Sequence, residues 1–193
     1  MKKYSQIIEE SINIKSAMIK DSILIDEINK SVDIITKSFR KGGKVLFCGN
    51  GGSADDAQHL AAEFSGRFYI DRKALQAEAL HCNTSYITAV GNDYGYEFVY
   101  SRIVDGIGKK GDVLVCISTS GNSVNIINAM CSAQKMGMKV IALTGFSGGK
   151  MKNYCDILLN VPSDKTPRIQ EAHILLGHII CEFVESNLFN LMK

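Results

Sequence analysis

The sequence contains no tryptophan and only two prolines in 193 residues, and no low-complexity stretch divides it. Domains of a longer chain are usually separated by exposed linkers rich in proline, glycine or polar residues. No apolar run approaches the length of a signal peptide's apolar segment or of a membrane span, which needs about 20 residues. The sequence therefore predicts a single cytoplasmic domain without a membrane partner.

A surplus of one charge is also missing, because 22 lysines and arginines stand against 20 aspartates and glutamates. Proteins that bind nucleic acids or acidic membranes usually carry a strong positive surplus. We therefore expect neither as a partner. The six cysteines form no Cys-x-x-Cys pair, which favours reduced, buried thiols in a reducing compartment over disulfides or a cysteine metal site.

Short apolar runs alternate with helical segments along most of the chain, after two amphipathic helices expected at 3–20 and 22–41. Strands separated by helices imply right-handed crossovers and a parallel sheet with helices on both faces. The sequence thus predicts an α/β fold. The expected strands are 44–48, 74–80, 112–118, 139–145 and 156–161, and the expected later helices are 53–66, 84–90, 96–107, 122–136, 148–154 and 167–190.

The first strand runs into a glycine-rich segment, Gly49–Ser53, and then restarts as a helix. Free backbone N–H groups at a helix start attract phosphate, and Ser53 is expected to be the N-cap residue. The spacing also fits a dinucleotide-binding fingerprint, which requires an acidic residue at the end of the second strand. Asp71 has the right separation but precedes that strand, so no nucleotide cofactor is predicted.

A second polar loop, Ser118–Ser123, follows the third strand and reads Ser-Thr-Ser-Gly-Asn-Ser. An N-cap followed by a hydrophilic turn would explain Asn122 or Ser123 but not four hydroxyls in six residues. Hydroxyls and free N–H groups at a helix start can surround a phosphate. The absence of lysine separates the loop from a Walker A motif. The sequence therefore predicts a phosphate site at this loop.

Two helices carry polar side chains that can converge. His59 and Glu63 lie about 40° apart around one helix, and Gln170 and His178 lie about 80° apart around the last helix, at about 100° per residue. Their nitrogen and oxygen atoms suit Zn²⁺. A general acid/base pair without metal explains the same residues, and their spacing leaves both interpretations open.

Two further polar positions have simpler explanations. Asn92 and Asp93 stand between Gly91 and Gly95 and are typical of a turn; they contact a sugar only if the fold returns them to the pocket. His173 lies about 60° from Gln170 and 140° from His178 around the helix, and is expected to be a structural or interface histidine.

Four segments, 48–68, 89–98, 111–127 and 168–178, resemble the sugar isomerase (SIS) domain family, and within it the phosphoheptose isomerases. The resemblance covers essentially the whole chain. It implies a three-layer, flavodoxin-like sandwich with a five-stranded parallel sheet. It also implies one SIS domain over 1–193, with leading helices in 1–43 and an α/β core in 44–193. Members of the family are usually homotetramers with active sites at subunit interfaces.

The activity implied by this resemblance is the conversion of D-sedoheptulose 7-phosphate to D-glycero-D-manno-heptose 7-phosphate through an enediol. That step begins the synthesis of activated heptose for surface polysaccharides. The resemblance assigns Glu63 and His178 as the acid/base pair, and one zinc ion per chain to His59, Glu63, Gln170 and His178. It implies substrate contacts, with Ser53 added as a neighbour, at Asn50, Gly51, Gly52, Ser53, Glu63, Asn92, Asp93, Ser118, Thr119, Ser120, Ser123 and Gln170.

The sequence departs from some relatives at Pro167, where they carry an acidic residue before the Arg-Ile-Gln-Glu motif. Any role of that acid in opening the sugar ring is therefore in question here. The alternative is a non-catalytic SIS regulator resembling the DnaA initiator-associating protein. That family lacks the histidine matched by His178, so the presence of Glu63, Gln170 and His178 together favours the enzyme.

Overall fold

A computed structural model describes residues 2–190 of the chain. One five-stranded sheet forms its centre, and all neighbouring strands are parallel. The strand order is β2-β1-β3-β4-β5, which is the flavodoxin-like order. The predicted five-stranded parallel sheet is thus confirmed, with strands β1 (Val45–Gly49), β2 (Ala77–Ala79), β3 (Val113–Ser118), β4 (Lys139–Thr144) and β5 (Ile157–Asn160).

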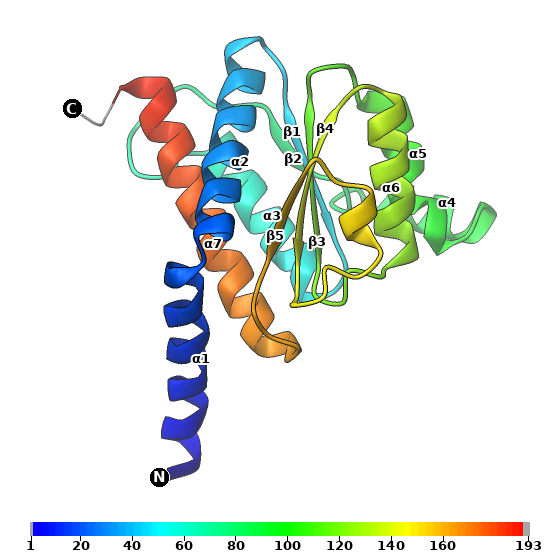
Figure 1. Cartoon of the computed structure of the whole chain (residues 1–193). Helices are drawn as coiled ribbons and strands as arrows, with labels where there is room; N and C mark the ends of the chain where they lie inside the picture. The colour runs from blue at the N-terminus through cyan, green and yellow to red at the C-terminus, as the bar shows by residue number, and fades with distance from the viewer. Residues whose placement is uncertain (1, 191–193) are drawn as a thin grey trace.

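Helices cover both faces of the sheet (Figure 1). One face packs against α2 (Ser22–Arg40), α3 (Gly52–Ser65) and α7 (Thr166–Phe189). The other face packs against α4 (Thr84–Asp93), α5 (Val99–Ile107) and α6 (Val124–Lys135). The molecule is therefore a three-layer sandwich, as the resemblance implied.

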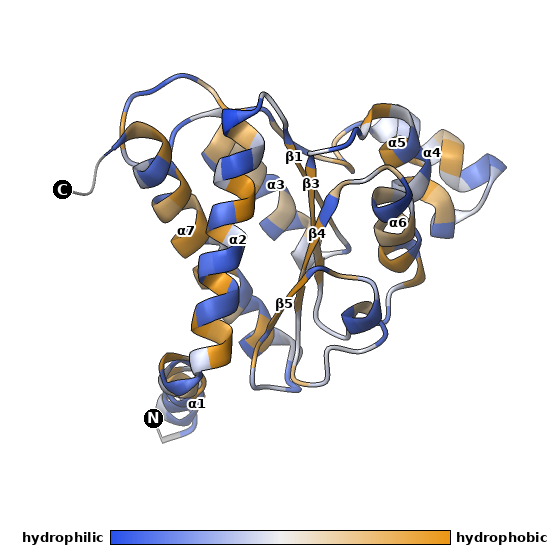
Figure 2. Ribbon diagram, turned by 45° about the horizontal axis from the view of Figure 1, so that its top comes forward, coloured by the Kyte–Doolittle hydropathy of each residue, from blue (hydrophilic) through white to orange (hydrophobic). Residues whose placement is uncertain are grey.

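Burial on both faces explains why the strands read as continuous apolar runs (Figure 2). Every residue of β1 and β3 is buried. Successive side chains of a strand point to opposite faces, so Val45 and Phe47 join the core beneath α2, α3 and α7. Leu46 and Cys48 join the core beneath α4, α5 and α6. Apolar side chains are needed on both sides of such a strand.

The first helix, α1 (Lys2–Lys20), projects away from the sandwich (Figure 1). Ser11 donates a hydrogen bond to Glu171 of α7, and Lys165 forms an ion pair with Glu10. Within residues 2–190, no helix combines the length and apolar character required to cross a bilayer.

Several local expectations were wrong. The expected helix at 148–154 is a single 3₁₀ turn (Met151–Asn153), preceded by Gly148 and Gly149 at positive φ, a conformation that does not continue a right-handed helix. The expected helix at 96–107 opens with a separate 3₁₀ turn (Tyr96–Phe98). Cys82 is exposed and Cys131 and Cys155 are half-buried, although the cysteines were expected to be buried.

Two expectations at the candidate site also require correction. Asn92 and Asp93 are the last residues of α4 rather than part of a turn. Gly51, at φ +56°, is the N-cap of α3, so Ser53 lies inside the helix and is buried. Glycine tolerates this left-handed conformation, which lets the helix begin two residues earlier than the serine suggested.

Candidate functional site

The two polar loops meet at the carboxyl edge of the sheet. Strands β1 and β3 are neighbours, and the strand order reverses between them, which is where ligands bind in open α/β sheets. A pocket of about 190 Å³ opens there, and it is lined by Asn50, Ser53, Ile117, Ser118, Thr119, Ser120, Ser123, Thr166 and Gln170. The structure thus brings together residues from both predicted phosphate loops.

Three serine hydroxyls lie close together in this pocket. Ser118 Oγ is 3.1 Å from Ser123 Oγ and 3.5 Å from Ser120 Oγ. Ser123 is the residue before α6, but its side chain makes no capping bond. Its hydroxyl is directed to Ser118 instead, which leaves it able to form a hydrogen bond with a ligand at the helix start.

Gly121 allows the serine loop to turn tightly. Its φ is +64°, and a Cβ atom there would lie 2.4 Å from the carbonyl oxygen of Gly148. Any larger residue would be strained and would push the two loops apart. The glycine therefore fixes how the three serines are presented.

Among the residues that the structure describes, none that lines the pocket carries a charged side chain. Helices α3 and α6 both begin beside the pocket. Helix dipoles and free N–H groups at these ends favour an anion, and the hydroxyls add further donors. The pocket therefore suits a phosphate group held by hydrogen bonds rather than by ion pairs.

A second polar group lies farther along α3 and on the facing helix α7. His59 Nε2 on α3 is 2.9 Å from His178 Nε2 on α7 and 3.3 Å from Glu63 Oε1. One ligand atom from each of the three residues lies within 4.8 Å of the others. The structure thus confirms that these three predicted residues come together across two helices.

The donor set of this group fits a zinc ion. Two ligand atoms on a tetrahedral zinc lie about 3.3 Å apart, given metal–ligand distances of about 2.0 to 2.1 Å. The spacings of 2.9 and 3.3 Å among His59, Glu63 and His178 are close to this value. Two facing imidazole nitrogens also need either one proton or one cation between them. The geometry therefore suits a divalent metal.

A close approach of α3 and α7 explains why the two histidines meet. Leu60 directly follows His59 in the sequence, and Gly177 directly precedes His178. A Cβ atom on Gly177 would lie 2.5 Å from the Leu60 side chain. Gly177 is buried. The missing side chain thus allows the helices to pack at a distance that joins His59 to His178.

Gln170 lies at the phosphate end of α7. It lines the pocket, and its Nε2 atom would be 2.5 Å from a Cβ on Gly52. Gln170 and His178 are eight positions apart, which corresponds to about 12 Å of helix. The grouping of Gln170 with the His/Glu cluster as a fourth metal ligand therefore stays a prediction.

Asn92 and Asp93 are exposed at the end of α4, where Asn92 Nδ2 donates to Asp93 Oδ1 at 2.8 Å. They are not among the residues that line the pocket within the described part of this chain. Their contact with substrate stays a prediction.

Sequence reasoning missed a buried ion pair behind the His/Glu cluster. Arg72 Nε is 2.7 Å from Glu185 Oε1, and both side chains are only 1% exposed. Arg72 also donates to the carbonyl oxygens of Glu63, Phe64 and Gly66 at the end of α3. Arg72 lies in an irregular segment, where hydrophobic periodicity carries no information.

Glu185 ties the segment after α3 to α7. Its carboxylate accepts hydrogen bonds from the backbone N–H groups of Phe68, Tyr69 and Ile70. Burial alone would raise the pKa of Glu185, but the Tyr69 amide, Arg72 and the other two amides outweigh it and lower this pKa. The ring of Phe68 then lies 5.8 Å from that of His178, centroid to centroid.

His173 is a structural residue. It is fully buried, and its Nε2 atom lies 3.1 Å from the carbonyl oxygen of Thr144 in β4. Burial lowers its pKa to about 4, although the Thr144 carbonyl acts in the opposite direction. The imidazole is therefore neutral at physiological pH and joins α7 to the sheet.

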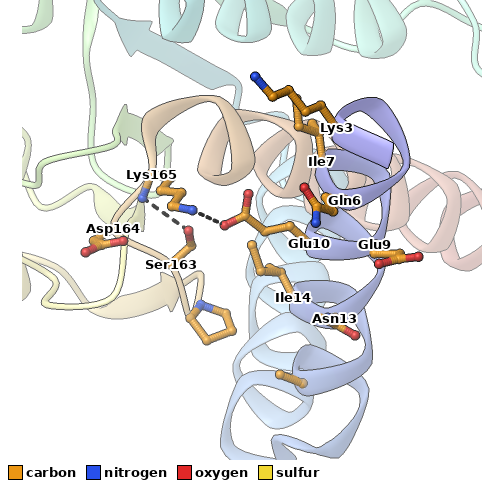
Figure 3. A pocket seen from close by; sticks show the side chains of 12 residues that line it. Lys3, Gln6, Ile7, Glu9, Glu10, Asn13, Ile14, Ser163, Asp164 and Lys165 are labelled. Atoms are coloured by element: carbon orange, nitrogen blue, oxygen red, sulfur yellow. Dashed lines mark hydrogen bonds and ion pairs between the residues drawn. The ribbon is translucent and has the colours of Figure 1, made fainter. Parts of the chain in front are cut away.

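A larger open hollow of about 860 Å³ lies between α1 and the loop before α7 (Figure 3). The Lys165–Glu10 ion pair crosses it, and Lys165 N also donates to Ser163 Oγ. Its lining comes from α1 and residues 162–165 and includes none of the serine loop. It is a gap beneath a projecting helix rather than part of the polar site.

Comparison with known proteins identifies close relatives. A family model described as "SIS domain" matches residues 7–145. The phosphoheptose isomerase of Clostridium acetobutylicum is 52% identical over 182 residues, which cover 94% of this chain and 93% of that protein. The phosphoheptose isomerase of Sulfurimonas denitrificans is 49% identical over 98% of this chain and 97% of its own.

Solved structures agree with these relatives. The phosphoheptose isomerase of Neisseria gonorrhoeae superposes with a TM-score of 0.90 at 46% identity, covering 96% of this chain and 98% of its own. That of Francisella tularensis gives a TM-score of 0.91 at 38% identity, covering 96% and 97%. With near-complete coverage in both sequence and structure, this chain belongs to the SIS domain family and, within it, to the phosphoheptose isomerases.

Proposed function

We propose that this protein isomerises sedoheptulose 7-phosphate to D-glycero-D-manno-heptose 7-phosphate, in the cytoplasm, at the start of heptose synthesis for surface polysaccharide. One observation carries the proposal. The serine-loop pocket and the His/Glu cluster both include residues of α3 and α7. Their separation of about 12 Å along α7 is a length that a phosphorylated seven-carbon chain can bridge. The phosphate then lies at the serine loop while C1 and C2 reach the cluster.

The proton transfers are assigned to Glu63 and His178. Isomerisation removes a proton from C1 of the ketose while O2 gains one, which gives the enediol. A proton then leaves O1 and another is added at C2, which gives the aldose. A carboxylate and an imidazole on facing helices can serve both ends of this enediol. Their position in the cluster supports this assignment.

The metal that fits the cluster is zinc, held by His59, Glu63 and His178, whereas Gln170, the fourth ligand that the resemblance implied, lies about 12 Å along α7 from His178. When bound, zinc would act as a Lewis acid toward the sugar oxygens at C1 and C2. A ring nitrogen that binds metal has no lone pair left to accept a proton. His178 therefore acts on protons only when its Nε2 atom is free of the metal.

Metal analysis tests the ligand set. Protein purified without chelator is expected to contain about one zinc per chain, and His59→Ala is expected to lose it because the cluster then keeps a single imidazole. His81→Ala is the matched control, since His81 lies outside the cluster. Full zinc retention in His59→Ala would show that other residues bind the metal.

Kinetics test the phosphate pocket. Ser118→Ala and Ser120→Ala are each expected to raise KM for the phosphorylated sugar. Each removes a hydrogen bond to a charged group, which corresponds to a loss of about 1 to 2 kcal/mol of binding free energy. Ser65→Ala is the control, since that hydroxyl bonds only to its own helix at Ala61. Unchanged KM in both pocket variants would place the phosphate elsewhere.

A homotetramer with active sites at subunit interfaces is part of the proposal. Its support is a set of exposed isoleucines on α1 and the start of α2, which a lone chain would leave in water: Ile7, Ile8, Ile12, Ile19 and Ile23. Exposed apolar patches of this kind commonly mark subunit interfaces. Light scattering measures the assembled mass.

The direct test of function is incubation of the purified protein with sedoheptulose 7-phosphate, followed by NMR of the products. We expect the heptose 7-phosphate to appear. If no turnover occurs, with or without added zinc, a non-catalytic SIS regulator becomes the better interpretation.

A further inference from the structure

Asn50, the first polar residue after β1, is held by a residue that the proposed mechanism does not use. Asn50 Nδ2 donates to Asn125 Oδ1 at 2.9 Å, and Asn125 Nδ2 donates back to Asn50 Oδ1 at 2.8 Å. Asn125 lies on α6 and is only 4% exposed. The two amides thus form a closed pair beneath the pocket.

The orientation of this pair follows from the backbone. The N–H of Ile126 can only donate, and it lies 3.0 Å from Asn125 Oδ1. The atom that it faces must therefore be the oxygen, which places the Asn125 amide nitrogen against Asn50. Because Asn125 must donate there, the atom of Asn50 that it meets must also be an oxygen.

A third residue completes the oxygen's hydrogen bonds. The Tyr96 hydroxyl lies 3.2 Å from Asn50 Oδ1. Together with Asn125 it supplies two donors, which match the two lone pairs of an amide oxygen. The Asn50 nitrogen has used one of its two hydrogens. One N–H remains, and Asn50 lines the pocket.

We propose that Asn125 is a positioning residue that makes Asn50 a donor without acceptor capacity, so that Asn50 recognises an acceptor oxygen on the carbon chain of the sugar phosphate rather than on its phosphate group. The inference rests on the proposed function for the identity of that ligand. Asn125 does not line the pocket, so it acts on the substrate through Asn50.

A double-mutant cycle tests this role. Asn125→Ala is expected to lower kcat/KM for sedoheptulose 7-phosphate about 10-fold, because Asn50 can then rotate and offer its oxygen instead. In an Asn50→Ala background the same change is expected to cost less than about 2-fold, since coupled residues are not additive. Inhibition by inorganic phosphate is expected to be unchanged in Asn125→Ala, because the serine loop is intact.

The control is Asn128→Ala, on the same helix, which removes a hydrogen bond to the Glu97 carbonyl but does not touch Asn50. If Asn125→Ala does not fold, Asn125→Ser replaces it, because a hydroxyl is too short to reach Asn50. Equal losses in both backgrounds, or weaker phosphate inhibition, would overturn the positioning role.

A wild type without turnover would instead overturn the proposed function. The same cycle measured by urea unfolding then decides the inference without substrate. Coupling between Asn50→Ala and Asn125→Ala would support the fixed pair, and additive effects would overturn it.

Discussion

Glu63→Gln and His178→Asn are each expected to lower kcat by about 10² to 10⁴, the usual contribution of a general acid or base. Glutamine keeps the shape of Glu63 and an oxygen atom but cannot accept the proton. Asparagine at 178 is of similar size but lacks the imidazole that faces His59 Nε2. Steady-state kinetics with sedoheptulose 7-phosphate measure both variants.

Each variant should still fold and bind the sugar phosphate, because the serine loop lies beside the start of α7 and outside the His/Glu cluster. Glu182→Gln is a matched control, since this carboxylate is on the same helix as His178 but outside the cluster. Near-normal turnover by both Glu63→Gln and His178→Asn would remove them from the chemistry.

Arg72→Ala and Glu185→Ala are each expected to lower the free energy of unfolding by about 3 to 5 kcal/mol, because either change leaves a buried charge without its partner. Both side chains are 1% exposed, so solvent cannot replace the lost contact. Denaturation in urea measures the effect. Arg67→Ala, at an exposed position of the same segment, is expected to be nearly neutral.

Replacing both members of the pair distinguishes their charges from their packing. Arg72→Met combined with Glu185→Leu is expected to cost less than either alanine variant, because no charge is left unpaired. A loss equal to the sum of the single losses would contradict this account.

The same pair predicts a pH dependence. The pKa of Glu185 is lower in the folded chain than its ordinary value of 4.5. Its stabilising effect is therefore complete above that ordinary value and is lost as the pH falls through the lower, folded value. Glu185→Gln should make unfolding less sensitive to acid in this range, when unfolding is followed from pH 5 downward.

The sequence predicted those parts of the fold in which local pattern and tertiary structure agree. Strands β1 and β3 are buried on both faces, so their apolar runs could only be central strands. The helix predicted at 148–154 was wrong because two glycines at positive φ interrupt any helix there. The φ angle of a glycine cannot be inferred from residue type alone. The start of α3 was misplaced for a similar reason, since Gly51 rather than Ser53 precedes the helix.

Part of the candidate site was equally predictable. His59 and Glu63 share a helix face, so their proximity follows from 3.6 residues per turn. Their contact with His178 depends on how two helices cross, which spacing within one helix cannot give. The Arg72–Glu185 and Asn50–Asn125 pairs join residues 113 and 75 positions apart. Such long-range polar pairs leave no local pattern in a single sequence.

Gly177 constrains how this family member can change. A methyl group at this position would meet Leu60, and the repulsion would separate the helices that carry His59 and His178. Such a substitution touches neither polar group, yet a shift of α3 against α7 would change the spacing of the cluster. A residue without a side chain therefore bears on the geometry of the cluster, and a search confined to polar residues would overlook it.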